Sequence, residues 1–435
     1  MALVLIAAVL FSAETRAEDW PQWRGPNRNG VWYEKGVVRK FDSPQLQPRW
    51  RAKIANGYNG PTVANGRVYV TDRIIEPTQL ERVHCFDTMT GQPIWSRSYE
   101  CVYKDIGYRN GPRASVTIDG NRAYSLGTMG HLYCFDAAKG SIIWNKDLFT
   151  EYKIRMPIWG IAAAPLIEKD LVIVQVGGSD NACIIAFDKS TGKEKWRALN
   201  DKASYSSPIV IKQAGKRVLA CWTAEHVVGL DPNSGRLYWQ QPFASIQSVT
   251  TPVIHKNFLF VSSFFEGSLL LKLHTDKLTV SPVWQRKGQD VKKTDSLHCC
   301  ISTPVLQGDY IYGVDSYGEL RCLDLHTGDR IWENLDAVPK ARWANIHMVR
   351  NQDNIWMFNE RGELIISKLS PKGFHEISRT KIINPTHGQL DKRGGVCWSH
   401  PAFACKRVYI RNDEELLCIN LSAQIASIPD SRNSM

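Results

Sequence analysis

A short element recurs along the chain with fixed spacing: Asp, three residues, Gly, three residues and Trp. Such self-similarity indicates that one supersecondary unit is copied several times, and it constrains the fold more than any other feature. Each copy follows alternating apolar and β-branched or aromatic residues, which is typical of paired strands. Five copies keep both spacings without an insertion: Asp87-Gly91-Trp95, Asp136-Gly140-Trp144, Asp188-Gly192-Trp196, Asp231-Gly235-Trp239 and Asp324-Gly328-Trp332.

Each unit is predicted to be a four-stranded antiparallel sheet. The Asp can hydrogen-bond to the backbone two residues on, and the Gly supplies the positive φ that closes a hairpin with a bulge. We expect the Trp to lie on the outermost strand and to pack its ring across the gap to the next unit. Because one sheet cannot bury both faces alone, the units must stack, and a closed ring leaves only short protected edges.

The number of units follows from a second repeated feature, a small residue or His followed by Pro at the start of a unit. Pro fits the first residue of a strand, where no ladder donor is required. A further unit at about 344–380 lacks the Pro, but NIWMFNERGELIISKL keeps the pattern of a strand, a Gly turn and a second strand. The total is therefore eight units. The seven Pro starts are Gly60-Pro61, Gly111-Pro112, Ala164-Pro165, Ser207-Pro208, Thr251-Pro252, Thr303-Pro304 and His400-Pro401.

The two chain ends are predicted to share one sheet. The unit that begins at Pro401 ends without an Asp-Gly-Trp element, whereas PRWRAKI at 48–54 carries Trp50 eleven residues before Pro61. We therefore expect the N-terminal strand to complete the last unit and close the ring. The predicted fold is all-β, an eight-bladed β-propeller over residues 45–422, with a Trp-, Pro- and Gly-rich segment at 18–44 and a tail at 423–435.

The segment at 18–44 contains PQWRGPNRNG, whose Pro and Gly content excludes a helix or a central strand. We interpret the segment as a clasp in which Trp20, Trp23 and Trp32 anchor the incoming chain over the side or end of the propeller.

The first residues predict export. ALVLIAAVLFSA at 2–13 is apolar and is followed by Thr15-Arg16-Ala17, with small residues where a signal peptidase reads. We expect a cleaved signal at 1–17 and a periplasmic or extracellular protein. The positive region that should precede the apolar stretch is missing, so a start upstream of Met1 and a buried strand are the alternatives. No run approaches the length of a membrane span.

The net charge of +11 could favour acidic polymers or anionic surfaces. Lys and Arg form no run of five or more, and the aromatic residues follow the repeat, so nucleic-acid binding is not expected. We expect a monomer.

The sequence contains eleven Cys residues, four of which stand at the same place in the repeat, two residues before Asp or Asn. A residue type repeated at one strand position is expected to fill a small space in the core rather than to form a disulfide. These cysteines are Cys85, Cys134, Cys322 and Cys418.

The fullest repeats, DTMTGQPIW and DLHTGDRIW, resemble those of the pyrroloquinoline-quinone (PQQ)-like eight-bladed propellers. The opening DWPQWRGPNRNGV looks like that of exported PQQ-binding-like propellers abundant in planctomycete-type bacteria. The resemblance covers almost the whole chain. It implies two activities on one architecture: quinoprotein alcohol dehydrogenases hold their cofactor in the central channel, whereas BamB is a non-enzymatic scaffold. Fold alone does not choose between them.

The loops that precede each first strand should face the channel mouth, and their side chains are the candidate site. Aromatic and cationic groups around a channel suit an anionic or planar ligand. The alternative is that they pack loop against loop, and His347 is interpreted as a satisfied core group. The adjacent pair Cys299-Cys300 resembles the vicinal cysteines of quinoproteins, although a core-filling pair is favoured. The candidate binding residues are Asn110, Arg113, Trp159, Cys299, Cys300, Arg342, Trp343, Trp398 and His400, beside Tyr108, Arg109 and Tyr205.

No set of catalytic residues or metal ligands is recognisable in the sequence. The leading hypothesis is a binding or scaffold module whose partner is an unidentified protein, a small molecule or an anionic polymer at the channel mouth. The alternative is a PQQ- and Ca²⁺-dependent alcohol or sugar oxidoreductase with its cofactor in the channel near Cys299 and Cys300. A third hypothesis is binding of acidic polysaccharide, suggested by the positive charge.

Overall fold

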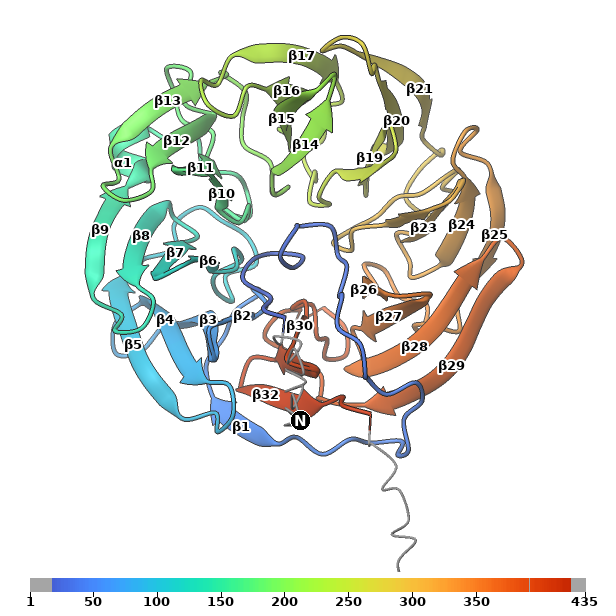
Figure 1. The fold of residues 1–435 in the computed structure, drawn as a ribbon, viewed down its shortest axis with the longest axis horizontal. Helices are drawn as coiled ribbons and strands as arrows, with labels where there is room; N and C mark the ends of the chain where they lie inside the picture. Colours follow the sequence, from blue (N-terminus) through green and yellow to red (C-terminus); the bar gives the residue numbers. More distant parts are fainter. Residues whose placement is uncertain (1–17, 391, 424–435) are drawn as a thin grey trace, which may run out of the picture.

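The computed structural model describes residues 18–390 and 392–423. Its strands form eight four-stranded antiparallel sheets, which stand as blades around one axis (Figure 1). The prediction of an eight-bladed propeller is therefore confirmed. The expected signal at 1–17 and most of the predicted tail lie outside the described residues.

The first four blades follow one another along the chain, each from its innermost to its outermost strand (Figure 1). Blade one comprises β2 (Thr62–Ala64), β3 (Arg67–Ile74), β4 (Leu80–Asp87) and β5 (Pro93–Glu100); blade two comprises β6 (Thr117–Asp119), β7 (Arg122–Leu126), β8 (His131–Asp136) and β9 (Ile142–Asp147). Blade three comprises β10 (Leu166–Glu168), β11 (Leu171–Gln175), β12 (Ile184–Asp188) and β13 (Glu194–Ala198); blade four comprises β14 (Ile209–Gln213), β15 (Lys216–Trp222), β16 (His226–Leu230) and β17 (Leu237–Pro242).

The remaining blades keep this order, except that the eighth takes its outermost strand from the N-terminal side of the chain. Blade five comprises β18 (Val253–His255), β19 (Phe258–Ser263), β20 (Gly267–Leu273) and β21 (Val280–Arg286); blade six comprises β22 (Val305–Gln307), β23 (Tyr310–Val314), β24 (Leu320–Asp324) and β25 (Arg330–Asn334). Blade seven comprises β26 (Ile346–Asn351), β27 (Asn354–Asn359), β28 (Glu363–Ser370) and β29 (Gly373–Lys381); blade eight comprises β30 (Ala402–Ala404), β31 (Arg407–Arg411), β32 (Glu415–Asn420) and β1 (Trp50–Lys53).

A short helix, α1 (Leu148–Tyr152), connects blades two and three. Across the described residues, no helix has the length and apolar character needed to cross a membrane.

The ring closes where the sequence predicts. β1 pairs antiparallel with β32, with Trp50 opposite Cys418 and Lys53 opposite Glu415. An ion pair between Arg51 and Glu415, with 2.6 Å between Nη1 and Oε1, bridges the same two strands. The first strand of the chain therefore completes the last blade.

The Asp-Gly-Trp element closes the outer hairpin of each blade that carries it, and its Trp then packs towards the next blade. In blade two, Oδ1 of Asp136 accepts hydrogen bonds from the backbone N–H groups of Ala138 and Lys139, at 3.0 and 2.8 Å. The indole Nε1–H of Trp95, on β5 of blade one, donates to the carbonyl oxygen of Ala137 at 3.0 Å. The Trp therefore lies on the outermost strand and packs across the gap, as predicted.

The hydrophobic core lies mainly between adjacent blades. One cluster joins Tyr124 and Leu132 of blade two to Val172, Val174 and Phe187 of blade three, all fully or almost fully buried. The recurrent cysteines fill core positions, and all eleven cysteines are free thiols. The structure therefore agrees with a core slot rather than a disulfide framework.

The segment at 18–44 crosses the middle of the ring before it runs outward past blade seven to β1 (Figure 1). Trp20 pairs with Val63 of β2, and the N–H of Trp32 donates to the carbonyl of Arg350 on β26 at 2.8 Å. Trp20 and Trp32 are almost completely buried. The expectation that the segment lies over the side or end of the propeller becomes specific: residues 21–31 lie across the end of the channel.

Candidate functional site

The loops that lead into the eight innermost strands converge on one cavity of about 230 Å³ at the centre of the ring. Every one of the eight loops contributes to its wall. From these loops the lining residues include, in blade order, Tyr58; Tyr108, Arg113 and Ser115; Trp159 and Ala164; Tyr205 and Ser207; Gln247; Cys300 and Ile301; Arg342 and Trp343; and Trp398 and His400.

Aromatic rings from neighbouring loops contact one another around the cavity. The ring centroids of Trp159 and Tyr205 lie 4.9 Å apart, and Tyr108 lies 5.9 Å from Trp159 in an edge-on arrangement. Tyr108 also lies 6.3 Å from Trp398, on the other side. These contacts fix the rings relative to one another, so the wall presents preformed aromatic surfaces.

Two of these aromatic residues have left-handed backbone conformations. Tyr108 has a φ of +52° and Trp343 a φ of +67°. A bulky residue in this region costs on the order of 1 kcal/mol or more, and such strain clusters at binding and active sites. Strained backbone also occurs in turns of the blades, for example at Asn65 and Lys256, so the conformations of Tyr108 and Trp343 do not by themselves single out the cavity.

Both charged residues of the wall are cationic. Arg113 lies 5.1 Å over the ring of Tyr58 and donates only to backbone carbonyls, including that of Gly111 at 2.8 Å. Arg342 is exposed and stacks 4.8 Å over the ring of Trp343. Within the described residues neither guanidinium forms an ion pair, and no carboxylate lines the cavity. The cavity therefore favours an anion.

The deep part of the cavity carries neutral polar groups. Nε2 of His400 lies 2.7 Å from Oγ of Ser115, and Nε2 of His347 lies 2.8 Å from the carbonyl oxygen of Trp398. Burial lowers the pKa of His347 to about 4 and that of His400 to about 3. His400 is therefore too weak a base to activate the Ser115 hydroxyl at neutral pH.

The two adjacent cysteines separate. Cys300 lines the cavity and accepts a hydrogen bond from the Gln247 amide, whose Nε2 lies 3.1 Å from the sulfur, whereas Cys299 packs in the core beside Phe260 and Leu297. Burial raises the pKa of Cys300 to about 12 and that of Cys299 as well. Both thiols are therefore protonated and poorly nucleophilic.

Asn110 also lies away from the cavity. It borders a neighbouring groove, where its Nδ2 donates to Oδ1 of Asp413 at 2.5 Å. The structure thus brings together seven of the nine candidate residues and places Asn110 and Cys299 elsewhere.

The residues of the cavity do not fit a PQQ–calcium pair. Calcium takes six to eight oxygen ligands and prefers carboxylates. Glu360 lies behind the wall, where its carboxylate accepts the indole N–H of Trp398 at 3.1 Å and pairs with Arg393 at 2.5 Å. The wall thus offers aromatic rings, guanidinium groups and neutral polar groups rather than a calcium ligand set.

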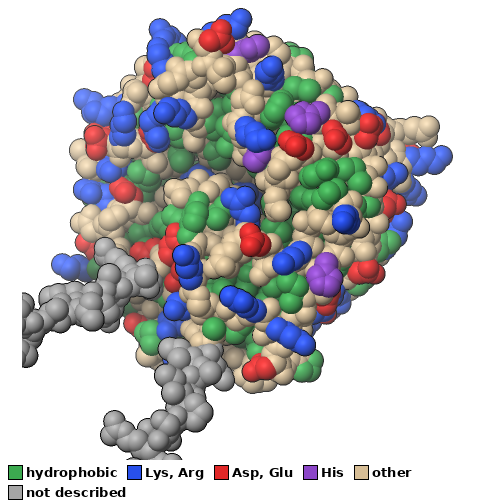
Figure 2. Space-filling view, turned by 45° about the vertical axis from the view of Figure 1, so that its right-hand side comes forward, with side chains coloured by type: hydrophobic (Ala, Val, Ile, Leu, Met, Phe, Trp, Pro, Cys, Tyr) green, Lys and Arg blue, Asp and Glu red, His purple; other side chains and the backbone are tan. Residues whose placement is uncertain are grey.

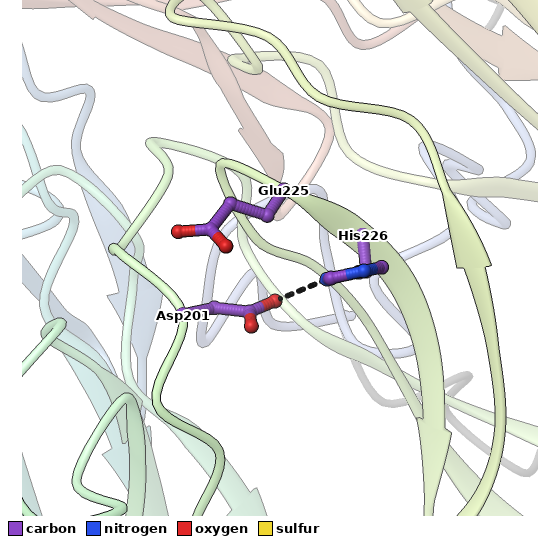
Figure 3. Close-up of side chains that lie close together, drawn as sticks. All are labelled: Asp201, Glu225 and His226. Atoms are coloured by element: carbon purple, nitrogen blue, oxygen red, sulfur yellow. Dashed lines mark hydrogen bonds and ion pairs between the residues drawn. The ribbon is translucent and has the colours of Figure 1, made fainter.

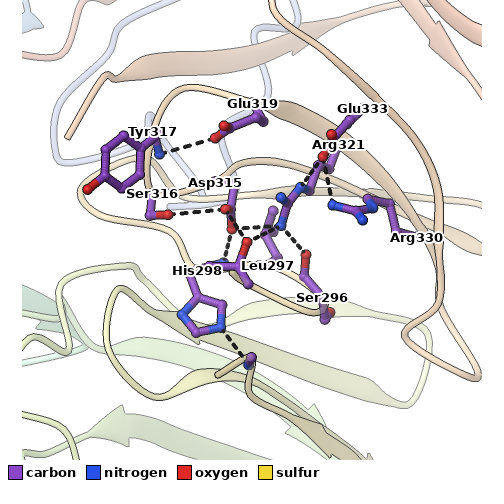
Figure 4. Close-up of polar contacts among 12 residues, drawn as sticks. Ser296, Leu297, His298, Asp315, Ser316, Tyr317, Glu319, Arg321, Arg330 and Glu333 are labelled. Carbon is purple, nitrogen blue, oxygen red and sulfur yellow. Dashed lines mark hydrogen bonds and ion pairs between the residues drawn. The ribbon is translucent and has the colours of Figure 1, made fainter. Parts of the chain in front are cut away.

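A buried ionic network holds the loop that carries Cys300 (Figure 4). Oδ1 of Asp315 accepts the backbone N–H of His298 at 2.6 Å and lies 3.1 Å from Nη1 of Arg321. Arg321 in turn donates to the carbonyl of Ser296 at 2.9 Å. The chain just before Cys300 is therefore tied to β24 and to the turn that precedes it.

A second polar cluster fixes the loop before β14 (Figure 3). Nδ1 of His226 lies 2.9 Å from Oδ2 of Asp201, and Thr223 donates to the same oxygen at 2.6 Å. Glu225 completes a group whose potential metal-ligating atoms all lie within 4.8 Å of one another. The hydrogen bonds tie the chain just before Tyr205 to the turn between β15 and β16.

Several cavity residues were missed by the sequence analysis. Tyr58 and Gln247 occupy pre-strand loops, so the rule that selected the other loops could have found them. Trp23 lines the cavity from the segment at 18–44, and only the path of the folded chain reveals this. Phe265 comes from the turn between β19 and β20, which the pre-strand rule does not include.

Comparison with known proteins gives relatives of two kinds. BamB of Moranella endobia (strain PCIT) is 23% identical over 293 residues, which cover 62% of this chain and 66% of that protein. The quinohemoprotein alcohol dehydrogenase of Comamonas testosteroni is 27% identical over 222 residues, which cover 48% of this chain and 29% of that protein. The matches therefore span less than two thirds of the length of either relative.

Solved structures show the same fold. BamB from Moraxella catarrhalis superposes with a TM-score of 0.57 at 18% identity, covering 86% of this chain and 97% of that structure. A europium-containing methanol dehydrogenase superposes with a TM-score of 0.64 at 12% identity, covering 92% and 90%. Both confirm the propeller architecture.

The family is shown by a longer match. Residues 32–97 and 79–334 match the family described as outer membrane protein assembly factor BamB, and together they cover well over half of the chain. The chain therefore belongs to this BamB-like, PQQ-like propeller family.

Proposed function

We propose that this protein is an exported binding module that holds a planar, anionic small molecule in the channel cavity without converting it. The observation that carries the proposal is the pair of guanidinium groups, Arg113 and Arg342, on an aromatic wall without a carboxylate. Guanidinium groups stacked on aromatic rings are preorganised for carboxylate or phosphate groups, and the rings suit a flat body.

The polarity of the cavity suggests how such a ligand is oriented. Arg342 is exposed, whereas His400, Cys300 and Ser115 are almost completely buried and neutral. The anionic group of the ligand would lie against Arg342, and its apolar end would lie deeper. Export is proposed from the apolar sequence at 2–13, and a monomer remains our expectation.

Acidic polymers are less well supported as ligands. Figure 2 shows Lys and Arg side chains scattered among acidic, polar and hydrophobic ones on the face drawn, without a continuous basic patch. A polyanion needs such a patch to bind along its length.

The test uses naphthalene-2,6-dicarboxylate as the probe, titrated by calorimetry in the presence of EDTA. We expect saturable binding whose affinity falls as the salt concentration rises. Arg342→Met should lower the affinity roughly tenfold or more, because a charge-assisted hydrogen bond is lost. The exposed Arg39→Met is the matched control and should leave the affinity unchanged. Naphthalene-2,6-dimethanol, which lacks the charge, should bind far more weakly.

Two results would contradict the proposal. One is the absence of binding of planar anions under these conditions. The other is oxidation of alcohols or sugars after addition of PQQ and Ca²⁺, followed by reduction of a dye, which would favour the oxidoreductase alternative.

A second candidate function is a scaffold for another protein, which family membership favours. Ile158 and Ile246, in loops beside the cavity, are 54% and 67% exposed and would suit a protein contact. Recovery of a partner from the cell envelope with the native chain, and its loss with Ile246→Asp, would support this function.

A further inference from the structure

Residues 21–31, here called the crossing loop, lie across the middle of the ring (Figure 1), and Trp23 of this loop lines the cavity. The loop is fixed at both of its ends. Trp20 exchanges two backbone hydrogen bonds with Val63 of blade one, at 2.8 and 2.9 Å, and Arg350 of blade seven donates to the carbonyl of Gly30 at 2.9 Å. The crossing loop is therefore part of the folded ring.

The far side of the crossing loop is held by one buried cation. Arg28 is 4% exposed, and its guanidinium donates to the carbonyls of Ala164 and Pro208, at 3.3 and 3.0 Å, and to that of Pro165. These carbonyls lie at the starts of the innermost strands of blades three and four. The loop thus spans the channel from blades seven and one to blades three and four.

Trp23, in the middle of the crossing loop, faces the cavity. Its Nε1–H donates to Thr251 Oγ1, before β18, at 2.7 Å, and its ring meets His400, before β30, edge to face at 4.5 Å. Trp23 is half-buried and lines the cavity beside these residues. Its indole therefore bridges blades five and eight and forms part of the cavity wall.

We propose that Trp23 is a ligand-contacting residue, the floor on which the apolar end of the bound molecule rests, and that ligand binding and docking of the crossing loop stabilise each other. This inference rests on the proposed function. The coupling follows from reciprocity: a ligand that contacts Trp23 binds better when the loop is docked, so it must also favour the docked loop by the same factor.

The experiment measures both sides of the coupling with naphthalene-2,6-dicarboxylate on the full chain. We expect Trp23→Ala to weaken probe binding roughly tenfold, since an aromatic contact is lost. Arg39→Met, at an exposed position in the same segment, should leave binding unchanged. Saturating probe should slow backbone hydrogen exchange over residues 20–31 in the native chain and have no such effect in Trp23→Ala.

A variant that keeps the Trp23 ring distinguishes the loss of a ligand contact from a folding defect of Trp23→Ala. Thr251→Val removes the acceptor of the indole N–H but leaves the ring in place. We expect faster exchange of the crossing loop without the probe, and restoration of protection when the probe is added.

The outcomes separate the two proposals. If the native chain binds the probe and Arg342→Met weakens it, but Trp23→Ala binds normally and the crossing loop gains no protection, the floor and the coupling are wrong and the proposed function stands. If the native chain binds no planar anion, the proposed function is wrong and the inference falls with it.

Discussion

The indole of Trp95 covers Gly140 of the next blade so closely that a Cβ atom on Gly140 would lie 2.5 Å from Cδ2 of the indole. The same relationship recurs between Trp50 and Gly91, and between Trp196 and Gly235. The Gly of the repeat thus has two roles, because it takes a positive φ and also leaves room for the Trp of the preceding blade.

Gly140→Ala should destabilise the propeller by more than a backbone effect alone. The positive φ of Gly140, +69°, costs an Ala about 1 kcal/mol, and forcing the Trp95 ring away adds about 1 to 3 kcal/mol. Urea denaturation of the variant and the native chain measures the sum.

The chain offers a matched control for this substitution. Gly120 has a φ of +57°, but no atom lies within 4 Å of the position that its Cβ would take. Gly120→Ala should therefore cost only the backbone effect. Equal losses at the two positions would show that the Trp95 contact adds no strain.

Arg28→Met should destabilise the fold by about 2 to 4 kcal/mol, because three buried carbonyls lose their shared donor. Met keeps most of the apolar stem, so the loss reports the guanidinium. The exposed Arg39→Met should change the free energy of unfolding by less than about 0.5 kcal/mol. A loss as small for Arg28 would show that water replaces its hydrogen bonds readily.

The blades could be predicted from the sequence because the repeat encodes each of them locally. Asp136 caps a turn with its own neighbours, and Gly140 and Trp144 follow at fixed spacing, so one copy predicts its strands without knowledge of the others. Ring closure could be predicted because Trp50 precedes Pro61 by nearly the same spacing as the Trp of one repeat precedes the Pro of the next. The second role of Gly140 could not be seen, because it depends on a ring from another blade.

The candidate site was predictable wherever it follows the repeat. Arg113, Trp159 and Trp398 line the cavity because each precedes an innermost strand. Cys299 and Cys300 show a limit of that rule, since successive residues of an extended chain point to opposite sides and only one can face the cavity. Trp23 belongs to no repeat, so only the tertiary path of residues 21–31 brings it there.

Thiol reactivity should single out Cys405. It is the one cysteine of the eleven that is not buried, although partial burial still raises its pKa. At pH 8, at most one thiol per native chain should react with Ellman's reagent in the fast phase, and Cys405→Ser should abolish that phase. Rapid reaction of Cys300 would contradict the raised pKa of its thiol.

Acidification should destabilise the propeller through His347 and His400. Their folded pKa values, about 4 and about 3, lie below the unfolded value of 6.5, so the unfolded chain binds more protons as the pH falls below 6.5. The stability they give is therefore present above pH 6.5 and is lost as the pH falls towards their folded values, by about 2 kcal/mol for each His at pH 5.

The measurement is the slope of the free energy of unfolding against pH between 6.5 and 5, where few carboxylates titrate. The native chain should take up about two protons on unfolding through these histidines, and His347→Gln or His400→Gln should each reduce the uptake by about one. An unchanged slope in the two cavity variants would mean that both imidazoles accept a proton in the folded state, so the deep end of the cavity would itself be cationic at low pH.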